Sequence, residues 1–314
     1  MDNNIYRIIA EKVQAPINEK LSPEERMERC LELSDLMTKV ATHVICHAIV
    51  DYEALMADER LAVANAFLQR TTSTHICNHK LTKEGIVLNY RGETFPLQEA
   101  YKTMMLTRSV YEHLVMFYFI YIAPKTDEER RVVWDVWKIS SKKNLLSYDP
   151  DGGVVKDDGQ DKTCEEIEAL RKDLFFTHLG MECYNKLDEW TAIGKPTQNG
   201  CIEFYRNRGR QDVRRVSYNQ AWRHLFGKDQ EYMNQLYRLL SIHCHPIHGG
   251  LLQYQGQADG DESLEAVPLY LSCCFLAYLC RLFLRLPPGG NKLLGDSFSE
   301  EEQEIFKALS RVQL

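Results

Sequence analysis

Four short stretches with the pattern of a helix N-terminus constrain the fold of this chain more than any other feature. Each begins with Ser or Thr and ends with Glu-Glu: Ser22–Glu25, Thr126–Glu129, Thr163–Glu166 and Ser299–Glu302. In such a stretch the hydroxyl accepts a hydrogen bond from the amide three residues on, and the last Glu reaches back to the first amide. The acidic first turn also suits the positive end of the helix dipole. Four such starts predict an α-helical protein.

The segments that follow these starts carry apolar residues at helical spacing, for example Leu33, Met37 and Val40. No comparably long stretch alternates with the two-residue period of a strand. The chain is therefore predicted to be an all-α, multi-helix bundle, with one short β-hairpin near 85–95. Helices are expected at 3–13, 23–48, 50–71, 97–122, 127–145, 163–187, 217–226, 229–244, 262–286 and 299–312.

Residues 1–314 are predicted to form a single all-α domain. The stretch 148–162 is rich in Asp and Gly, and we expect it to be a mobile loop between two helical halves. Both halves contain long apolar helices that need partners, and the loop lacks the proline-rich character of a spacer. One continuous core is therefore expected.

Charge and cysteine content limit the class of protein. The net charge of -7 argues against a surface covered in nucleic-acid-binding charge, although a local basic stripe is compatible with it. The ten cysteines are scattered and no signal peptide precedes them, so reduced thiols and a cytoplasmic location are expected. The apolar run 266–280 is shorter than the roughly 20 residues that span a bilayer, which predicts a buried core helix and no membrane contact.

Two histidine clusters are candidates for metal binding. His43 and His47 are one helical turn apart and share a face, which is the geometry of a two-histidine contact to a metal. His75, Cys77 and His79 place three donors at alternate positions, but without paired Cys-x-x-Cys knuckles. Ordinary core or surface residues are the favoured interpretation of both clusters, and a His-ligated metal protein is the alternative.

The helix predicted at 97–122 carries a charged pair at the start of a long apolar run. Arg108 and Glu112 are one turn apart and lie on nearly the same face, whereas His113 lies about 140° around the helix from Arg108. Burying two opposite charges beside an apolar run costs desolvation free energy, so such charges are expected to form an ion pair or to belong to a functional site. An internal ion pair and a functional site remain the two alternatives.

Residues 241–250, SIHCHPIHGG, place histidines at the end of a predicted helix. Pro246 disfavours the α conformation in the residue before it, so the helix is expected to end near His245. The negative end of the helix dipole favours imidazolium there, which makes His245 a candidate proton carrier. The alternative is that these histidines only cap the helix.

The segment 205–215 contains a local concentration of arginines. Its arginines offer bidentate donors to phosphate, and neighbouring tyrosines have rings on which bases could stack, so the segment is a candidate contact for RNA or a nucleotide. The alternative is a solvated loop balanced by nearby Asp and Glu. The candidate residues are Arg206, Arg208, Arg210, Arg214 and Arg215.

Dinucleotide-binding, phosphate-loop and nucleophile-elbow motifs are missing from the sequence, so no cofactor is expected.

Two stretches carry a resemblance to a known family. Arg108-Ser109-x-x-Glu112, together with Tyr237-Arg238-x-x-Ser241-x-x-x-His245-Pro246, resembles a family of bacterial, all-helical proteins of unknown function, distantly similar to the HEPN superfamily. The match extends loosely over residues 50–250. HEPN proteins are helical bundles, typically dimers, and many are metal-independent ribonucleases that use Arg-x(4–6)-His, a spacing that Arg108 and His113 satisfy. Ser109 stands where that motif usually has Asn, Asp or His, and the motif here leads into a buried run.

The resemblance implies an RNA-cleaving or RNA-binding protein, and a homodimer. Its expected site consists of Arg108, Glu112, His113 and His245: Arg108 would stabilise charge on the phosphate, and His113 or His245 would move the proton. The alternatives are a non-catalytic helical binding module in a defence or regulatory system, and the His43/His47 metal protein.

Overall fold

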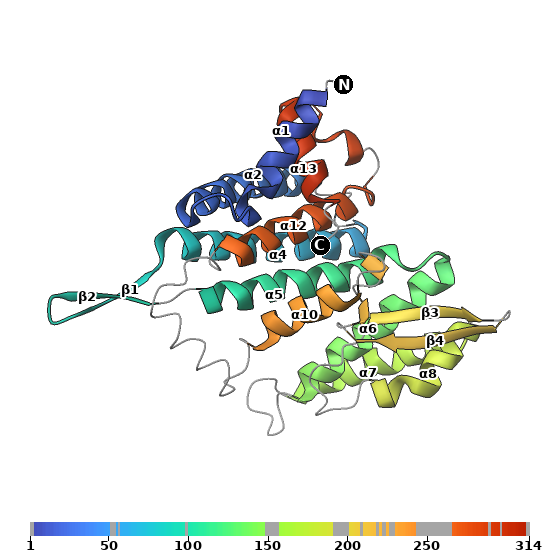
Figure 1. Cartoon of the computed structure of the whole chain (residues 1–314). Helices are drawn as coiled ribbons and strands as arrows, with labels where there is room; N and C mark the ends of the chain where they lie inside the picture. Colours follow the sequence, from blue (N-terminus) through green and yellow to red (C-terminus); the bar gives the residue numbers. More distant parts are fainter. Residues whose placement is uncertain are drawn as a thin grey trace. The chain divides into compact units, whose positions relative to one another are not determined.

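The computed structural model describes residues 3–50, 55, 57–97, 100–147, 157–190, 201–207, 210–217, 220–221, 224–225, 230–242, 266–287, 290–295 and 297–311. The prediction of an all-α fold is confirmed, because helices dominate and the strands form only two-stranded hairpins. The chain divides into two compact units (Figure 1). Unit 1 comprises Met1–Leu114 and Lys228–Leu314, and unit 2 comprises Val115–Gly227.

The division between the units falls within helix α5 (Ala100–Phe117) and not at the predicted loop 148–162. Residues 148–156 lie outside the described part of the chain. Residues 157–162 are helical, because they begin α7 (Asp157–Leu174), so the loop prediction is wrong for them. A single core shared by all 314 residues stays a prediction.

Unit 1 is built around helix α12 (Ala266–Phe283). This helix packs against α2 (Pro23–Val50), α4 (Glu59–Glu84) and α13 (Glu300–Leu309). It is buried around nearly its whole circumference, which is why its sequence is apolar without helical periodicity. By length and composition α12 could cross a membrane, but most of it is buried inside the protein, as expected of a core helix. Among the described residues, unit 1 also contains α1 (Asn3–Gln14), the 3-10 helix η1 (Ala15–Ile17), most of α5, α10 (Gln230–Ile242) and the 3-10 helix η5 (Gly290–Lys292).

Helix α4 differs from its predicted range of 50–71 at both ends. It begins after Asp58, whose side chain accepts hydrogen bonds from the amides of Arg60 and Leu61. It ends at Gly85, which has a φ of 64° and therefore suits a residue without a Cβ. The segment from Thr72 to Glu84, which the sequence analysis left outside any helix, is the part of α4 that carries His75 and His79.

The hairpin predicted near 85–95 is confirmed. Strands β1 (Ile86–Tyr90) and β2 (Glu93–Leu97) pair antiparallel, and Tyr90 lies opposite Glu93. Arg91 and Gly92 both have positive φ, which is the backbone of a tight two-residue turn. The hairpin projects from the helices of unit 1 (Figure 1).

Unit 2 contains the end of α5, a π-helical turn η2 (Tyr118–Ile122), α6 (Asp127–Ser147), α7, α8 (His178–Trp190) and a second hairpin of β3 (Cys201–Asn207) and β4 (Arg210–Val216). Helices α6, α7 and α8 pack against one another, and α8 also packs against β4. The single helix predicted at 163–187 is two helices, since the chain turns at residues 175–177. The predicted helix 217–226 is only partly described.

Three of the four predicted helix starts are confirmed by reciprocal hydrogen bonds. The pairs are Ser22 with Glu25, Thr126 with Glu129, and Ser299 with Glu302. The fourth prediction is wrong, because Thr163 lies inside α7, which starts at Asp157. A capping sequence permits a helix to start but does not prevent an earlier start.

Replacing Ser299 by Ala is expected to lower the free energy of unfolding by about 1 kcal/mol. The Ser299 hydroxyl accepts from the Glu302 amide, and Ala would leave that amide without its cap. Thermal denaturation followed by circular dichroism measures the loss. Ser297→Ala, two residues earlier and also exposed, is the matched control and should leave the melting temperature unchanged. Equal melting temperatures for both variants would contradict a stabilising cap.

Candidate functional site

The charged pair of α5 forms an ion pair on one face of the helix. Nε of Arg108 donates to Oε1 of Glu112 at 2.8 Å, and the two side chains are 16% and 30% exposed. This confirms that the two residues share a face, as their spacing predicts. Partial burial makes the contact less screened than a surface pair, so Glu112 holds the plane of the guanidinium in a defined orientation.

Tyr237 of α10 completes what we call the α5–α10 cluster: Arg108, Glu112 and Tyr237. Nη2 of Arg108 lies 3.3 Å from the Tyr237 hydroxyl, and that hydroxyl donates to Oε1 of Glu112 at 3.4 Å. The Arg108 guanidinium also lies 5.3 Å from the centre of the Tyr237 ring, within the range of a cation–π contact. The two hydrogen bonds of the Tyr237 hydroxyl are therefore longer than the 2.8 Å bond between Arg108 and Glu112.

The Tyr237 side chain is anchored to the core of unit 1. Its ring packs against Tyr111 at 5.5 Å between centroids, and Tyr111 packs in turn against Phe275 of α12 at 5.4 Å. Burial, with a smaller contribution from the Glu112 charge, raises the pKa of Tyr237, which keeps the phenol protonated at neutral pH. Tyr237 is thus a rigid hydrogen-bond donor in the cluster. Sequence reasoning did not select it, although it stands in the Tyr-Arg-x-x-Ser stretch of the resemblance.

His113 faces a different helix from Arg108. Its Nδ1 lies 3.1 Å from Oγ1 of Thr71 on α4, and the Thr71 hydroxyl donates its proton to the carbonyl of Phe67. Thr71 can therefore only accept from His113, so His113 carries its proton on Nδ1. Burial, and then the nearby Arg70, lower the pKa of His113 to about 4, so the ring is neutral at pH 7. The contacts described for His113 lead to α4, whereas those of Arg108 lead to Tyr237.

His245 lies outside the described residues, as do Pro246 and the glycines at 249 and 250. Helix α10 is described as far as Ile242, and the Ser241 hydroxyl donates to the Tyr237 carbonyl at 2.6 Å. The placement of His245 beside the α5–α10 cluster stays a prediction.

His43 and His47 lie together on α2, with ring centroids 4.4 Å apart. Nε2 of His43 donates to the carbonyl of Leu293 at 3.0 Å, because a carbonyl oxygen can only accept. That nitrogen is thus engaged by the backbone. In the part of the chain that the structure describes, no group of three or more His, Cys, Asp or Glu side chains is arranged to hold a metal ion.

The described residues of the arginine segment lie on the paired strands β3 and β4, whereas the alternative interpretation from the sequence was a solvated loop. Buried residues on both strands, Cys201, Ile202, Val213 and Val216, anchor it to unit 2. Arg206 donates to Glu129, a carboxylate only 3% exposed, at 3.2 Å. The Arg214 guanidinium lies over the Tyr205 ring at 4.4 Å and binds Asp212. Arg208 lies outside the described residues, and the backbone of Arg210 pairs with Asn207.

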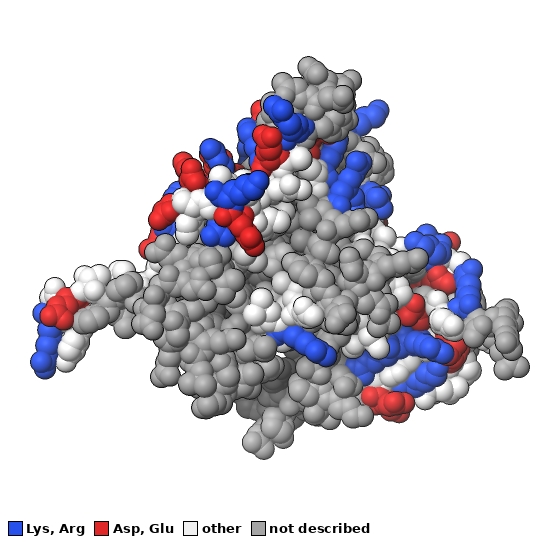
Figure 2. Space-filling view, in the orientation of Figure 1, with Lys and Arg blue, Asp and Glu red and all other residues white. Residues whose placement is uncertain are grey.

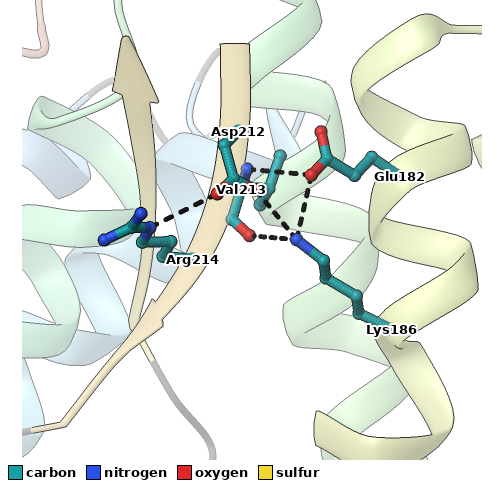
Figure 3. A network of polar contacts seen from close by, with 5 residues as sticks. All are labelled: Glu182, Lys186, Asp212, Val213 and Arg214. Atoms are coloured by element: carbon teal, nitrogen blue, oxygen red, sulfur yellow. Dashed lines mark hydrogen bonds and ion pairs between the residues drawn. The ribbon is translucent and has the colours of Figure 1, made fainter. Parts of the chain in front are cut away.

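Arg206 and Arg214 each pair with an acidic side chain. Asp212 lies between Arg214 on one side and Lys186 of α8 on the other (Figure 3). Lys186 also binds Glu182 and the carbonyl of Val213. The hydrogen bond from Lys186 to Asp212, and then the hydrogen bonds of Glu182 and Arg214, hold the pKa of Asp212 well below its usual range. Basic and acidic side chains are likewise interspersed on the face shown in Figure 2. A phosphate at this hairpin would therefore compete with carboxylates for Arg206 and Arg214.

Protein-family models, curated proteins and solved structures were all compared with this chain, and none of them matches it.

Proposed function

We propose that this protein binds RNA and cleaves it without a metal ion, at a site built on Arg108, Glu112 and Tyr237 of unit 1 and completed by His245. The observation that carries the proposal is the contact between Arg108 and Tyr237 across 129 positions of the chain. These two residues belong to the two stretches on which the HEPN-like resemblance rests. Helix α10 brings Tyr237 to Arg108, and His245 follows on the same stretch of chain.

The chemistry needs a base, a donor to the phosphate and an acid. The RNA 2'-hydroxyl attacks the adjacent phosphorus, the bond to the 5'-oxygen breaks, and a 2',3'-cyclic phosphate and a 5'-hydroxyl result. Arg108 stabilises the charge that gathers on the phosphate oxygens, and Glu112 is a positioning residue that orients the guanidinium. His245 takes the 2'-hydroxyl proton and returns it to the leaving oxygen. His113 is left out of this assignment, because its described contacts hold it neutral against α4.

The arginine segment is the second RNA contact in this proposal. Arg206, Arg208, Arg210, Arg214 and Arg215 would bind phosphates without reading sequence, which makes affinity fall as salt rises. Because carboxylates already hold Arg206 and Arg214, we expect this contribution to be small.

The test is incubation of labelled single-stranded RNA and transfer RNA with the protein in EDTA. Arg108→Ala is expected to lower the cleavage rate by about 100-fold or more, as loss of a donor to a developing oxyanion does. His245→Ala should lower it similarly. Tyr237→Phe, which keeps the ring and removes the hydroxyl, should have a smaller effect.

Arg7→Ala is the matched control, because Arg7 forms an exposed i,i+4 pair with Glu11 and its loss changes the net charge equally. Circular dichroism of each variant separates unfolding from loss of the site. Equal products from wild type, Arg108→Ala and His245→Ala would refute cleavage at this site. RNA binding without cleavage, weakened by Arg108→Ala, would instead support the non-catalytic binding module.

A further inference from the structure

A chain of polar side chains crosses the otherwise apolar core of unit 1. It runs from Asp35 on the surface of α2 through His79, Ser34 and His75 to Ser272 of α12, and we call it the Ser34 chain. Asp35 is 69% exposed and His79 is 12% exposed, whereas Ser34, His75 and Ser272 are fully buried. No part of the proposed RNA chemistry uses these residues.

Hydrogen-bond contacts join His79, Ser34, His75 and Ser272, and a longer ion-pair contact joins His79 to Asp35. Nδ1 of His79 and Nε2 of His75 lie 2.9 Å and 3.0 Å from the same Ser34 hydroxyl. Nδ1 of His75 lies 2.8 Å from the Ser272 hydroxyl, and Nε2 of His79 lies 3.6 Å from Oδ1 of Asp35. Both nitrogens of both histidines therefore face a polar partner, and the two rings share one hydroxyl.

The shared hydroxyl couples the protons of the two rings, because Ser34 has one hydrogen to donate. When His79 is neutral, the Asp35 carboxylate favours a proton on Nε2 of His79, so Nδ1 accepts from Ser34. Ser34 then accepts from Nε2 of His75, and Nδ1 of His75 accepts from Ser272. In this state the single proton of His75 is on Nε2.

Protonation of His79 reverses the donor and acceptor in each hydrogen bond of the Ser34 chain. Nδ1 of His79 then carries a proton and donates to Ser34, so the Ser34 hydrogen turns to Nε2 of His75, which must be unprotonated to accept it. The proton of His75 is now on Nδ1 and is donated to Ser272. Solvent supplies one proton, His79 keeps it, and every other group retains the number of protons that it had.

Among the described residues, a carboxylate and a thiol lie against members of the chain, and His79 and the Ser34 backbone act on the pKa of His75. Asp35 of α2 is the carboxylate against His79, and Cys273 of α12 is a thiol against Ser34. Burial raises the pKa of Cys273 far above its usual range, with smaller effects from Cys30 and Cys274, so the thiol is neutral. A neutral sulfur is a weak acceptor, and the Ser34 hydrogen therefore prefers a histidine nitrogen. Burial also keeps His75 itself neutral until about pH 4.

We propose that the Ser34 chain is a pH-sensitive switch in which protonation of His79 near the surface moves the proton of buried His75 from Nε2 to Nδ1. The switch carries the protonation state of His79 to Ser272 of α12, the central helix of unit 1. The Ser272 hydroxyl changes from donor to acceptor towards His75.

The experiment is ¹⁵N NMR of the histidine rings in the full-length protein, from about pH 8 to about pH 5, a range that spans the ordinary titration of histidine. A protonated and an unprotonated ring nitrogen give well separated shifts, so the tautomer of His75 is read directly. We expect the proton of His75 to be on Nε2 at about pH 8 and on Nδ1 at about pH 5. The midpoint of this change should equal the midpoint of the protonation of His79.

Two variants isolate the coupling. In His79→Gln, which replaces a ring near the surface, His75 should keep one tautomer throughout. Asp35→Asn, at an exposed position, should move both the His79 titration and the His75 exchange to lower pH. His178→Gln, an exposed histidine of unit 2, should leave both unchanged. A His75 tautomer that is constant in the wild-type protein, or that still exchanges in His79→Gln, would overturn the proposal.

Discussion

Acidification from pH 7 to about pH 4 is expected to lower the free energy of unfolding by about 3 kcal/mol through His75 alone. Burial lowers the pKa of His75 to about 4 in the folded chain, against about 6.5 for an exposed histidine. Between about pH 4 and pH 6.5, His75 binds a proton in the unfolded chain but not in the folded chain. The stabilisation is therefore complete above pH 6.5 and is lost as the pH falls towards 4.

His113 should add a contribution of the same sign, because its pKa is also lowered to about 4 by burial and by Arg70. Urea unfolding at several pH values between about 7 and 4.5 measures the slope of stability against pH. That slope is proportional to the number of protons taken up on unfolding, and His75→Gln and His113→Gln should each lower this number by about one.

The exposed His178 is the control for these two substitutions, and His178→Gln should leave the slope unchanged. A His75→Gln protein with the wild-type slope would show that His75 titrates as it does in the unfolded chain, which contradicts its burial.

Replacing Gly180 by Ala is expected to destabilise the protein by about 3 kcal/mol, the upper part of the range for overpacking. Gly180 lies in the first turn of α8, where its amide donates to the Thr177 hydroxyl. A Cβ at this position would lie 2.2 Å from the carbonyl oxygen of Leu174 and 2.5 Å from Oγ1 of Thr177. The carbonyl belongs to the backbone at the end of α7 and cannot rotate away.

The sign of this effect distinguishes the clash from simple helix propensity, which would make Ala more stable than Gly by up to about 1 kcal/mol. Gly295→Ala is the control, because its Cβ would meet only the Lys292 carbonyl, at an ordinary 3.4 Å. Chemical denaturation of both variants gives the comparison. A Gly180→Ala protein as stable as wild type would contradict the expected clash between the new Cβ and the Leu174 carbonyl.

The helical class of the fold was predictable because its signals are local. Ser22, Thr126 and Ser299 cap helices through partners three residues away, so their sequence context is sufficient. Thr163 shows the limit of this reasoning, since nothing in its own four residues excludes a helix that begins earlier, at Asp157.

The hairpin β3–β4 was missed for a related reason. Arg214 and Arg215 are adjacent on β4 and therefore lie on opposite faces of the strand, which hides the two-residue period. Its buried anchors, such as Cys201 and Val216, are few and lie mostly outside the arginine run. The strands are stabilised by packing against α8, which no local pattern of residues reports.

For the candidate site, the sequence by itself determined that Arg108 and Glu112 share a face of α5 and that His113 points elsewhere, because helical geometry relates residues within one turn. Only the tertiary structure decided that Tyr237 joins them, that Thr71 and Phe67 set the tautomer of His113, and that Arg206 reaches Glu129. Apart from the local Thr71–Phe67 hydrogen bond, those contacts join residues 42 to 129 positions apart. Such contacts depend on how whole helices pack, and the period of a sequence sets which face a helix buries but not which partner it meets.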